Sequence, residues 1–124
     1  MIFLLLAYAL TSQPSPATPF APAPAPAVIE DPDWVQLPTG ADFIAAFPRA
    51  AIEQGASGQA LIECRVADEG RLGDCAVLSE TPAEYGFGQA TLALAEHFRM
   101  GPESLSGAPV DGGIVRLPIV WKLN

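Results

Sequence analysis

The sequence has few positive charges, and this shortage excludes several classes of partner. Six Lys and Arg residues stand against 14 Asp and Glu residues, which gives a formal net charge of −8. The basic residues form no cluster, so neither a phosphate backbone nor an anionic membrane surface is an expected partner. We therefore expect no nucleic-acid binding, whereas the acidity favours solubility and a partner with some basic character.

Paired catalytic groups and metal-ligand patterns are also missing. His97 is the only histidine, and no nucleophile or acid is suggested near it by spacing, so we interpret it as a surface helix residue. Cys64 and Cys75 form no CxxC motif and have no second pair at zinc spacing. The pair Gly86-x-Gly88 is not followed by the GK[ST] of a phosphate loop. The sequence thus predicts no enzyme, no cofactor and no metal site.

The chain lacks the run of about 20 apolar residues that a membrane-spanning helix needs. Residues 1–12 begin instead with the short apolar stretch MIFLLLAYAL, in which Ala7–Ala9 has the small-x-small form of a cleavage site. No basic residue precedes this stretch. We expect residues 1–12 to be a signal-like segment or a truncated membrane anchor, and either interpretation implies export.

Residues 13–33 are rich in alanine and proline. Six prolines fall within residues 14–27, and their fixed φ and missing N–H groups exclude helix and sheet there. Such a composition favours an extended polyproline II linker of about 3.1 Å per residue. A ligand for an aromatic groove is the alternative interpretation. The folded domain is predicted to occupy residues 34–124.

Hydrophobic periodicity and turn residues predict the order α, β-hairpin, α, β within this domain. Helices are expected at residues 41–47, 48–54 and 87–98, and strands at residues 60–67, 72–79 and 114–123. Thr39 is the expected N-cap of the first helix, and Gly55 is the expected stop of the second. Pro118 cannot donate a ladder hydrogen bond, so the last strand should lie at an edge or be bulged. The expected fold class is α+β, a small antiparallel three-stranded sheet with helices packed on one face.

The turn within the segment Asp68–Arg71 determines which hairpin residues face each other. A two-residue loop places Cys64 opposite Cys75, and a three-residue loop shifts the register by one. The first register also places Arg65 opposite Asp74, with opposite charges paired. In an oxidising compartment the two cysteines would form a cross-strand disulfide. The alternative is two buried thiols that pack as small apolar residues.

Several short motifs, in this order and at this spacing, resemble the C-terminal domain of TonB. That family couples inner-membrane energy to outer-membrane receptors in Gram-negative bacteria. The motifs are Phe47-Pro48, Gly58, the turn Asp68–Leu72, the segment Phe98–Pro102, and Pro109-Val110 followed by the strand that ends at Leu123. The cysteine pair, the segment Ser79–Pro82 and the segment Gly86–Gly88 are most similar to TonB-like proteins of alphaproteobacteria.

The resemblance implies binding by strand addition. In the family, an extended peptide near the N-terminus of an outer-membrane receptor pairs with the edge of this sheet. The candidate partner-binding residues are Val115, Arg116, Leu117, Ile119 and Val120, with Phe47 and Pro48 as neighbours. The module would be periplasmic, either exported or tethered to the inner membrane. A homodimer through the open edge is a second candidate partner, and an exported structural or regulatory adaptor of the same fold is the alternative function.

Overall fold

The computed structural model describes residues 26–123. The predicted signal-like segment and residues 13–25 of the predicted linker lie outside the described residues. The strands are β1 (Trp34–Gln36), β2 (Gly58–Val66), β3 (Leu72–Thr81), β4 (Arg99–Met100) and β5 (Ile114–Trp121). The α-helices are α1 (Gly40–Ala46), α2 (Arg49–Gln54) and α3 (Phe87–Leu94), and the single 3₁₀ turns are η1 (Asp68–Gly70), η2 (Ala83–Tyr85) and η3 (Ala95–His97).

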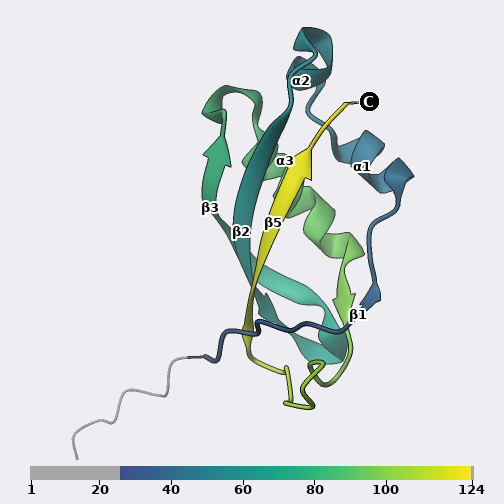
Figure 1. Ribbon diagram of the computed structural model, residues 1–124, viewed down its shortest axis with the longest axis vertical. Helices are drawn as coiled ribbons and strands as arrows, with labels where there is room; N and C mark the ends of the chain where they lie inside the picture. Colours follow the sequence, from purple (N-terminus) through teal and green to yellow (C-terminus); the bar gives the residue numbers. More distant parts are fainter. Residues whose placement is uncertain (1–25, 124) are drawn as a thin grey trace, which may run out of the picture.

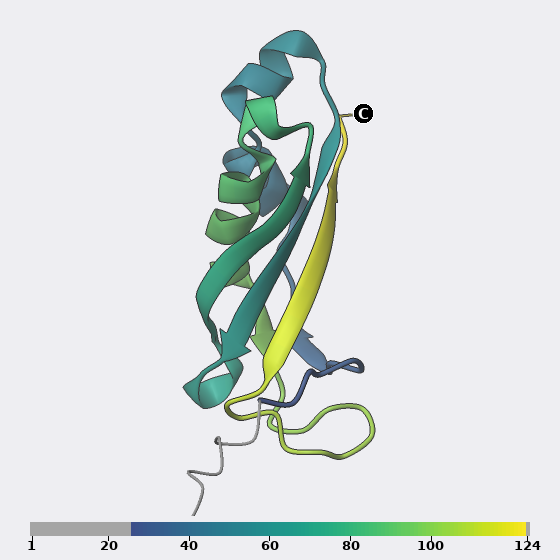
Figure 2. The same ribbon diagram turned by 90° about the vertical axis from the view of Figure 1, so that its left-hand side faces the viewer.

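Three of the strands form one antiparallel sheet in the order β3-β2-β5, so β3 and β5 are its two edges (Figure 1). The helices lie on one side of this sheet, as the view turned by 90° shows (Figure 2). This arrangement confirms the expected α+β class. The short strands β1 and β4 pair in a second, two-stranded sheet that the sequence did not predict.

The helices begin and end slightly differently from the prediction. Thr39 is the N-cap of α1, as expected, and a capping box joins it to Asp42. Pro48 is the N-cap of α2 and has extended backbone angles, so its expected place inside the helix is wrong. The long helix ends at Leu94 rather than Phe98, because the chain tightens into η3 and then extends into β4, which pairs with β1.

The hairpin loop has the three-residue form that the sequence left open as the alternative, since the N–H of Ala67 donates to the carbonyl of Arg71 at 2.7 Å and Val66 pairs with Leu72. Arg71 donates its backbone N–H to the carbonyl of Asp68 at 3.3 Å, and Glu69 and Gly70 between them both have positive φ. A side chain at Gly70 would collide with the backbone of Met100, which packs directly beneath the turn. The turn and β4 are therefore in close contact.

A β-bulge in β3 changes the register beyond the turn. Glu63 and Arg65 of β2 face residues 76 and 73, so Asp74 and Cys75 both lie opposite Cys64. The predicted pairing of Arg65 with Asp74 is wrong, because the three-residue loop places Gly73 opposite Arg65. Asp74, with a φ of 48°, is the extra residue that brings Cys75 back opposite Cys64. The predicted disulfide between Cys64 and Cys75 is present, with an S–S distance of 2.06 Å.

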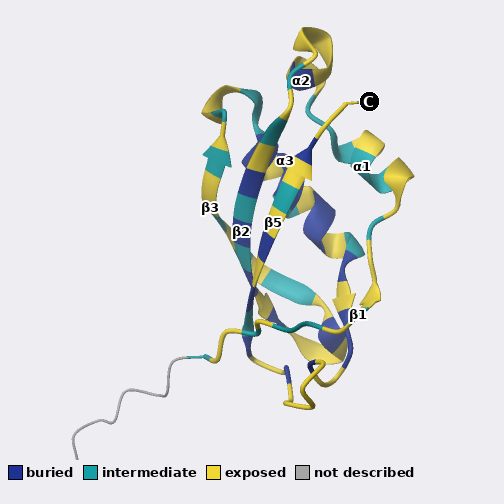
Figure 3. Ribbon diagram, viewed as in Figure 1, coloured by how far each residue is buried: buried dark blue, intermediate teal, exposed yellow. Residues whose placement is uncertain are grey.

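The core lies between the sheet and α3, where buried positions of both meet (Figure 3). Trp121 at the end of β5 is completely buried, and its indole N–H donates to the hydroxyl of Thr91 on α3 at 2.9 Å. That hydroxyl donates in turn to the carbonyl of Phe87 at 2.8 Å. Phe43 and Phe47 pack edge-on against the Trp121 ring. This aromatic cluster holds α1, α3 and the end of β5 together.

Candidate functional site

The free side of β5 is a regular strand edge. β5 pairs with β2 along all eight of its residues without a register shift. It lies at the end of the sheet order, so its other side faces away from β2. This placement confirms the edge position that Pro118 predicted. The backbone groups on that other side are the first requirement for pairing with another strand.

The direction of these backbone groups follows from Ile114. Its N–H donates to the carbonyl of Ala27 at 2.9 Å, and its carbonyl accepts the N–H of Ile29 at 2.7 Å. Both groups of Ile114 therefore point away from β2. Because backbone direction alternates along an antiparallel strand, the groups of every second residue after Ile114 point the same way. These residues are Arg116, Pro118 and Val120.

The side chains of β5 also alternate. Val115 and Leu117 are buried, Ile119 is half-buried, and Arg116, Pro118 and Val120 are exposed, a pattern visible along β5 in Figure 3. The structure thus divides the candidate residues of the sequence analysis into two sets. Val115, Leu117 and Ile119 turn their side chains toward the core and their backbone groups toward β2. Arg116, Pro118 and Val120 turn their backbone groups toward the free edge.

Arg116 is the one charged residue within β5. Its Nε donates to the Glu63 carboxylate on the neighbouring strand at 3.1 Å, and about half of its side chain is exposed. The contact crosses the sheet surface that faces away from the helices. It holds the guanidinium over β2, away from the free edge.

A groove lies where α1 approaches the end of β5. Its volume is about 830 Å³, and it is lined by Gly40, Phe43, Ile44, Phe47, Val120, Trp121, Lys122 and Leu123. Ile44 is 75% exposed on one side and Val120 is 56% exposed on the other. Of the two neighbours expected from the sequence, Phe47 lines this groove, whereas Pro48 caps α2 beside it.

The first turn of α1 is organised by polar contacts. The backbone N–H of Thr39 donates to the Asp42 carboxylate at 2.8 Å and lowers the pKa of that carboxyl group. The Nδ1 atom of His97 lies 3.8 Å from the Asp42 carboxylate, and its Nε2 atom lies 3.4 Å from the Glu96 carboxylate. We interpret these contacts as structural, because among the described residues they bring no nucleophile to the histidine.

A segment that the sequence assigned to the linker packs along the domain. Besides the pairing of residues 27–29 with Ile114, the carboxylate of Asp31 accepts the N–H of Ser106 at 2.8 Å. Hydrogen bonding to Ser106 lowers the pKa of Asp31. The carbonyl of Asp33 accepts the N–H of Gly101 at 2.8 Å. Alanine and proline content alone carries no sign of this docking, because the contacts are made by the backbone and by Asp31.

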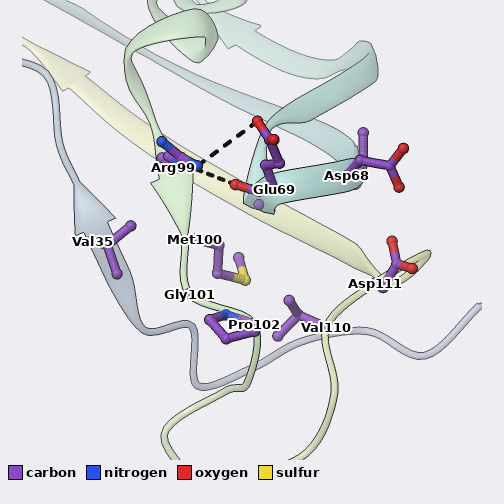
Figure 4. A pocket seen from close by; sticks show the side chains of 11 residues that line it. Val35, Asp68, Glu69, Arg99, Met100, Gly101, Pro102, Val110 and Asp111 are labelled. Carbon is purple, nitrogen blue, oxygen red and sulfur yellow. Dashed lines mark hydrogen bonds and ion pairs between the residues drawn. The ribbon is translucent and has the colours of Figure 1, made fainter.

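A second cavity lies at the opposite end of the domain, beside the hairpin turn (Figure 4). Its volume is about 360 Å³. Met100, Val110 and Pro102 form apolar walls, and Arg99 closes one side by donating to the Glu69 carbonyl at 2.8 Å. Arg99 is the one basic residue that lines this cavity, and it is thus already paired with the turn.

Within residues 26–123, no group of three or more His, Cys, Asp or Glu residues is placed to hold a metal ion. No helix in that same part of the chain is both long enough and apolar enough to cross a membrane.

Comparison with known proteins identifies the domain. Residues 45–123 match the family model described as Gram-negative bacterial TonB protein C-terminal. The solution NMR structure of the Pseudomonas aeruginosa TonB C-terminal domain is similar, with a TM-score of 0.56 and 20% identity over 81% of this chain and 96% of that one. No curated protein matched the chain. The chain belongs to the family of Gram-negative bacterial TonB C-terminal domains, which is not a family of enzymes.

Proposed function

We propose that this chain is a periplasmic module of TonB-dependent transport that binds an extended peptide of an outer-membrane receptor. The peptide adds to the free side of β5 as a fourth strand. The observation that carries this proposal is the outward backbone of Arg116, Pro118 and Val120 on a strand without bulges. Membership of the TonB C-terminal family supports the choice of a receptor as partner.

The edge already pairs with an extended segment at one position. Residues 27–29 run parallel to β5 and form a bridge at Ile114. Beyond this bridge, Arg116 and Val120 each offer one N–H and one carbonyl, and Pro118 offers a carbonyl only. Main-chain pairing of this kind supplies affinity, and exposed side chains beside it supply selectivity.

The location and the subtype are parts of the same proposal. The disulfide between Cys64 and Cys75 suits an oxidising compartment such as the periplasm. Residues 1–12 would direct export or anchor the chain at the inner membrane, and residues 13–25 would act as a spacer. The cysteine pair also supports grouping the chain with alphaproteobacterial TonB-like proteins.

A titration of the full chain with receptor peptides tests the proposal. The ¹⁵N-labelled protein is mixed with synthetic N-terminal peptides of outer-membrane receptors from the same genome. We expect the largest amide shifts at Arg116 and Val120 and smaller shifts in β3. The matched control is the same peptide with alternate backbone nitrogens methylated, because methylation removes the main-chain donors without changing the side chains.

Two results would overturn the proposal. If no receptor peptide shifts the amides of β5, strand addition fails, and the exported adaptor of the same fold becomes the better hypothesis. If the same amides shift with protein concentration alone, the edge serves a homodimer instead.

A further inference from the structure

The two ends of the free edge of β5 have different neighbours. At Ile114 the outward backbone is already paired with residues 27–29. At the other end, beyond Val120, the edge continues into the groove between β5 and α1. The part of the edge that is available to an added strand therefore runs from Arg116 to this groove.

Most of the groove wall is apolar. Phe43, Phe47 and Trp121 are aromatic wall residues, and Ile44 and Leu123 leave 75% and 41% of their surface exposed. Exposed apolar surface of this kind gains free energy when another apolar group covers it, at about 25 cal/mol per Å². Lys122 is the one charged residue in the lining, so a basic side chain would be repelled there.

We propose that this groove receives one apolar side chain from the end of the added peptide and thereby selects among receptor peptides. This inference rests on the function proposed above. An extended chain advances about 3.3 Å per residue, so a strand paired with Arg116 and Val120 reaches the groove with its next residues. Val120 belongs to both surfaces, since its backbone faces the free edge and it is one of the residues that line the groove.

The occupant is an extended peptide because the groove adjoins the outward backbone of Val120, which pairs with none of the residues that the structure describes. A small apolar molecule would fill the groove and leave the outward groups of Val120 to water. A peptide strand satisfies these groups and covers Ile44 and Leu123 at the same time. The structure already shows that this edge accepts an extended segment, at Ile114.

Substitution of the exposed wall residue tests the inference. In the full chain, Ile44→Glu should weaken binding of the receptor peptides about tenfold, because it places a charge where an apolar side chain is covered. The matched control is Leu105→Glu. Leu105 is 73% exposed, similar to Ile44, but it lies in the loop before β5 and does not line the groove. We expect Leu105→Glu to leave peptide affinity unchanged.

The peptide provides the second half of the test. Each apolar residue of a binding peptide is replaced in turn by serine, and affinity is measured with the unchanged protein and with Ile44→Glu. One replacement should weaken binding about tenfold to the unchanged protein and have little further effect in Ile44→Glu, because the two changes remove the same contact.

The possible failures are distinguishable. If the unchanged protein binds receptor peptides, and both Ile44→Glu and Leu105→Glu bind them as tightly as it does, the groove inference is wrong and strand addition stands. If the unchanged protein binds none of the peptides, the proposed function itself fails. Equal thermal unfolding midpoints of the two variants exclude misfolding as the cause of a difference. If Ile44→Glu lowers the midpoint, Ile44→Ser replaces it in the same comparison.

Discussion

The two edges of the sheet are built differently, although both belong to strands that pair with β2. β3 shifts its register twice, once around Asp74 and once around Leu78, which lies between the partners of Ile62 and Leu61. β5 keeps one register along its whole length. β-Bulges twist an edge and interrupt its ladder, so they discourage pairing with another strand.

This difference shows how one small sheet can offer a single binding edge. The bulges leave the pairing of β3 irregular, whereas β5 pairs regularly and its free edge is interrupted only by the missing donor of Pro118. The disulfide joins β3 to the central strand, and the buried Trp121 joins β5 to α3. Each edge strand is thus fixed to the rest of the domain by its own contact, which we call its anchor: the disulfide for β3 and Trp121 for β5. The predictions below remove or modify these features one at a time.

The largest effect is expected from removing the anchor of β5. Trp121→Ala deletes a completely buried side chain and leaves the Thr91 hydroxyl without its donor. We expect a loss of about 3–5 kcal/mol in the free energy of unfolding, measured by urea denaturation. Val120→Ala on the same strand is the control and should lose less than about 1 kcal/mol, because Val120 is 56% exposed. Similar losses in both variants would contradict the role of Trp121.

The next effect concerns the anchor of β3. Replacing both cysteines by serine removes a cross-link between residues separated by 11 positions. We expect a loss of about 3 kcal/mol in the free energy of unfolding, because the unfolded chain gains conformational freedom. Peptide affinity at β5 should change little. Reductant added to the unchanged protein should reproduce the loss, and a stability insensitive to reductant would contradict this prediction.

A smaller effect is expected where the free edge lacks a donor. Pro118→Val should add an outward N–H to β5, and one additional main-chain hydrogen bond contributes about 0.5–1.5 kcal/mol. Receptor peptides should therefore bind about three- to tenfold more tightly in isothermal titration. Val120→Pro is the converse variant and should weaken binding by a similar factor. Unchanged affinity in both variants would show that the peptide does not pair with this edge.

The smallest effect is expected at the ion pair on the sheet surface. Arg116 and Glu63 are 3.1 Å apart, and 53% and 29% of their side chains are exposed. Arg116→Ala should cost less than about 1 kcal/mol in the free energy of unfolding, since solvent and salt screen such pairs. A double-mutant cycle with Glu63→Gln measures the coupling at low and high salt. A coupling that does not fall with salt would contradict this assignment.

Most of the element order could be predicted from local signals. Thr39 and Gly55 mark helix ends through side-chain capping and left-handed backbone, which depend only on nearby residues. Pro118 indicated an edge strand for the same reason. The bulge at Asp74 could not be predicted, because neither residue type nor periodicity shows where a strand carries an extra residue. The pairing of β1 with β4 also escaped prediction, since three- and two-residue strands have too little periodicity.

The candidate site could be predicted only in part. The sequence indicated which strand carries the edge, through its resemblance to the TonB family. It did not separate the residues of β5 that face β2 from those that face outward, because this depends on the register with β2. It also did not indicate the groove, whose two walls are formed by α1 and by the end of β5, about 75 residues away along the chain.

The sequence by itself determined the fold class, the place of the hairpin turn, the one pair of cysteines that could be joined and the strand with the missing donor. Each of these depends on residue identity and local spacing. Tertiary structure alone decided that residues 27–29 occupy the start of the free edge and that Ile44 and Val120 line one groove. Both arrangements join segments far apart in the chain, so only the packing of the folded protein brings them together.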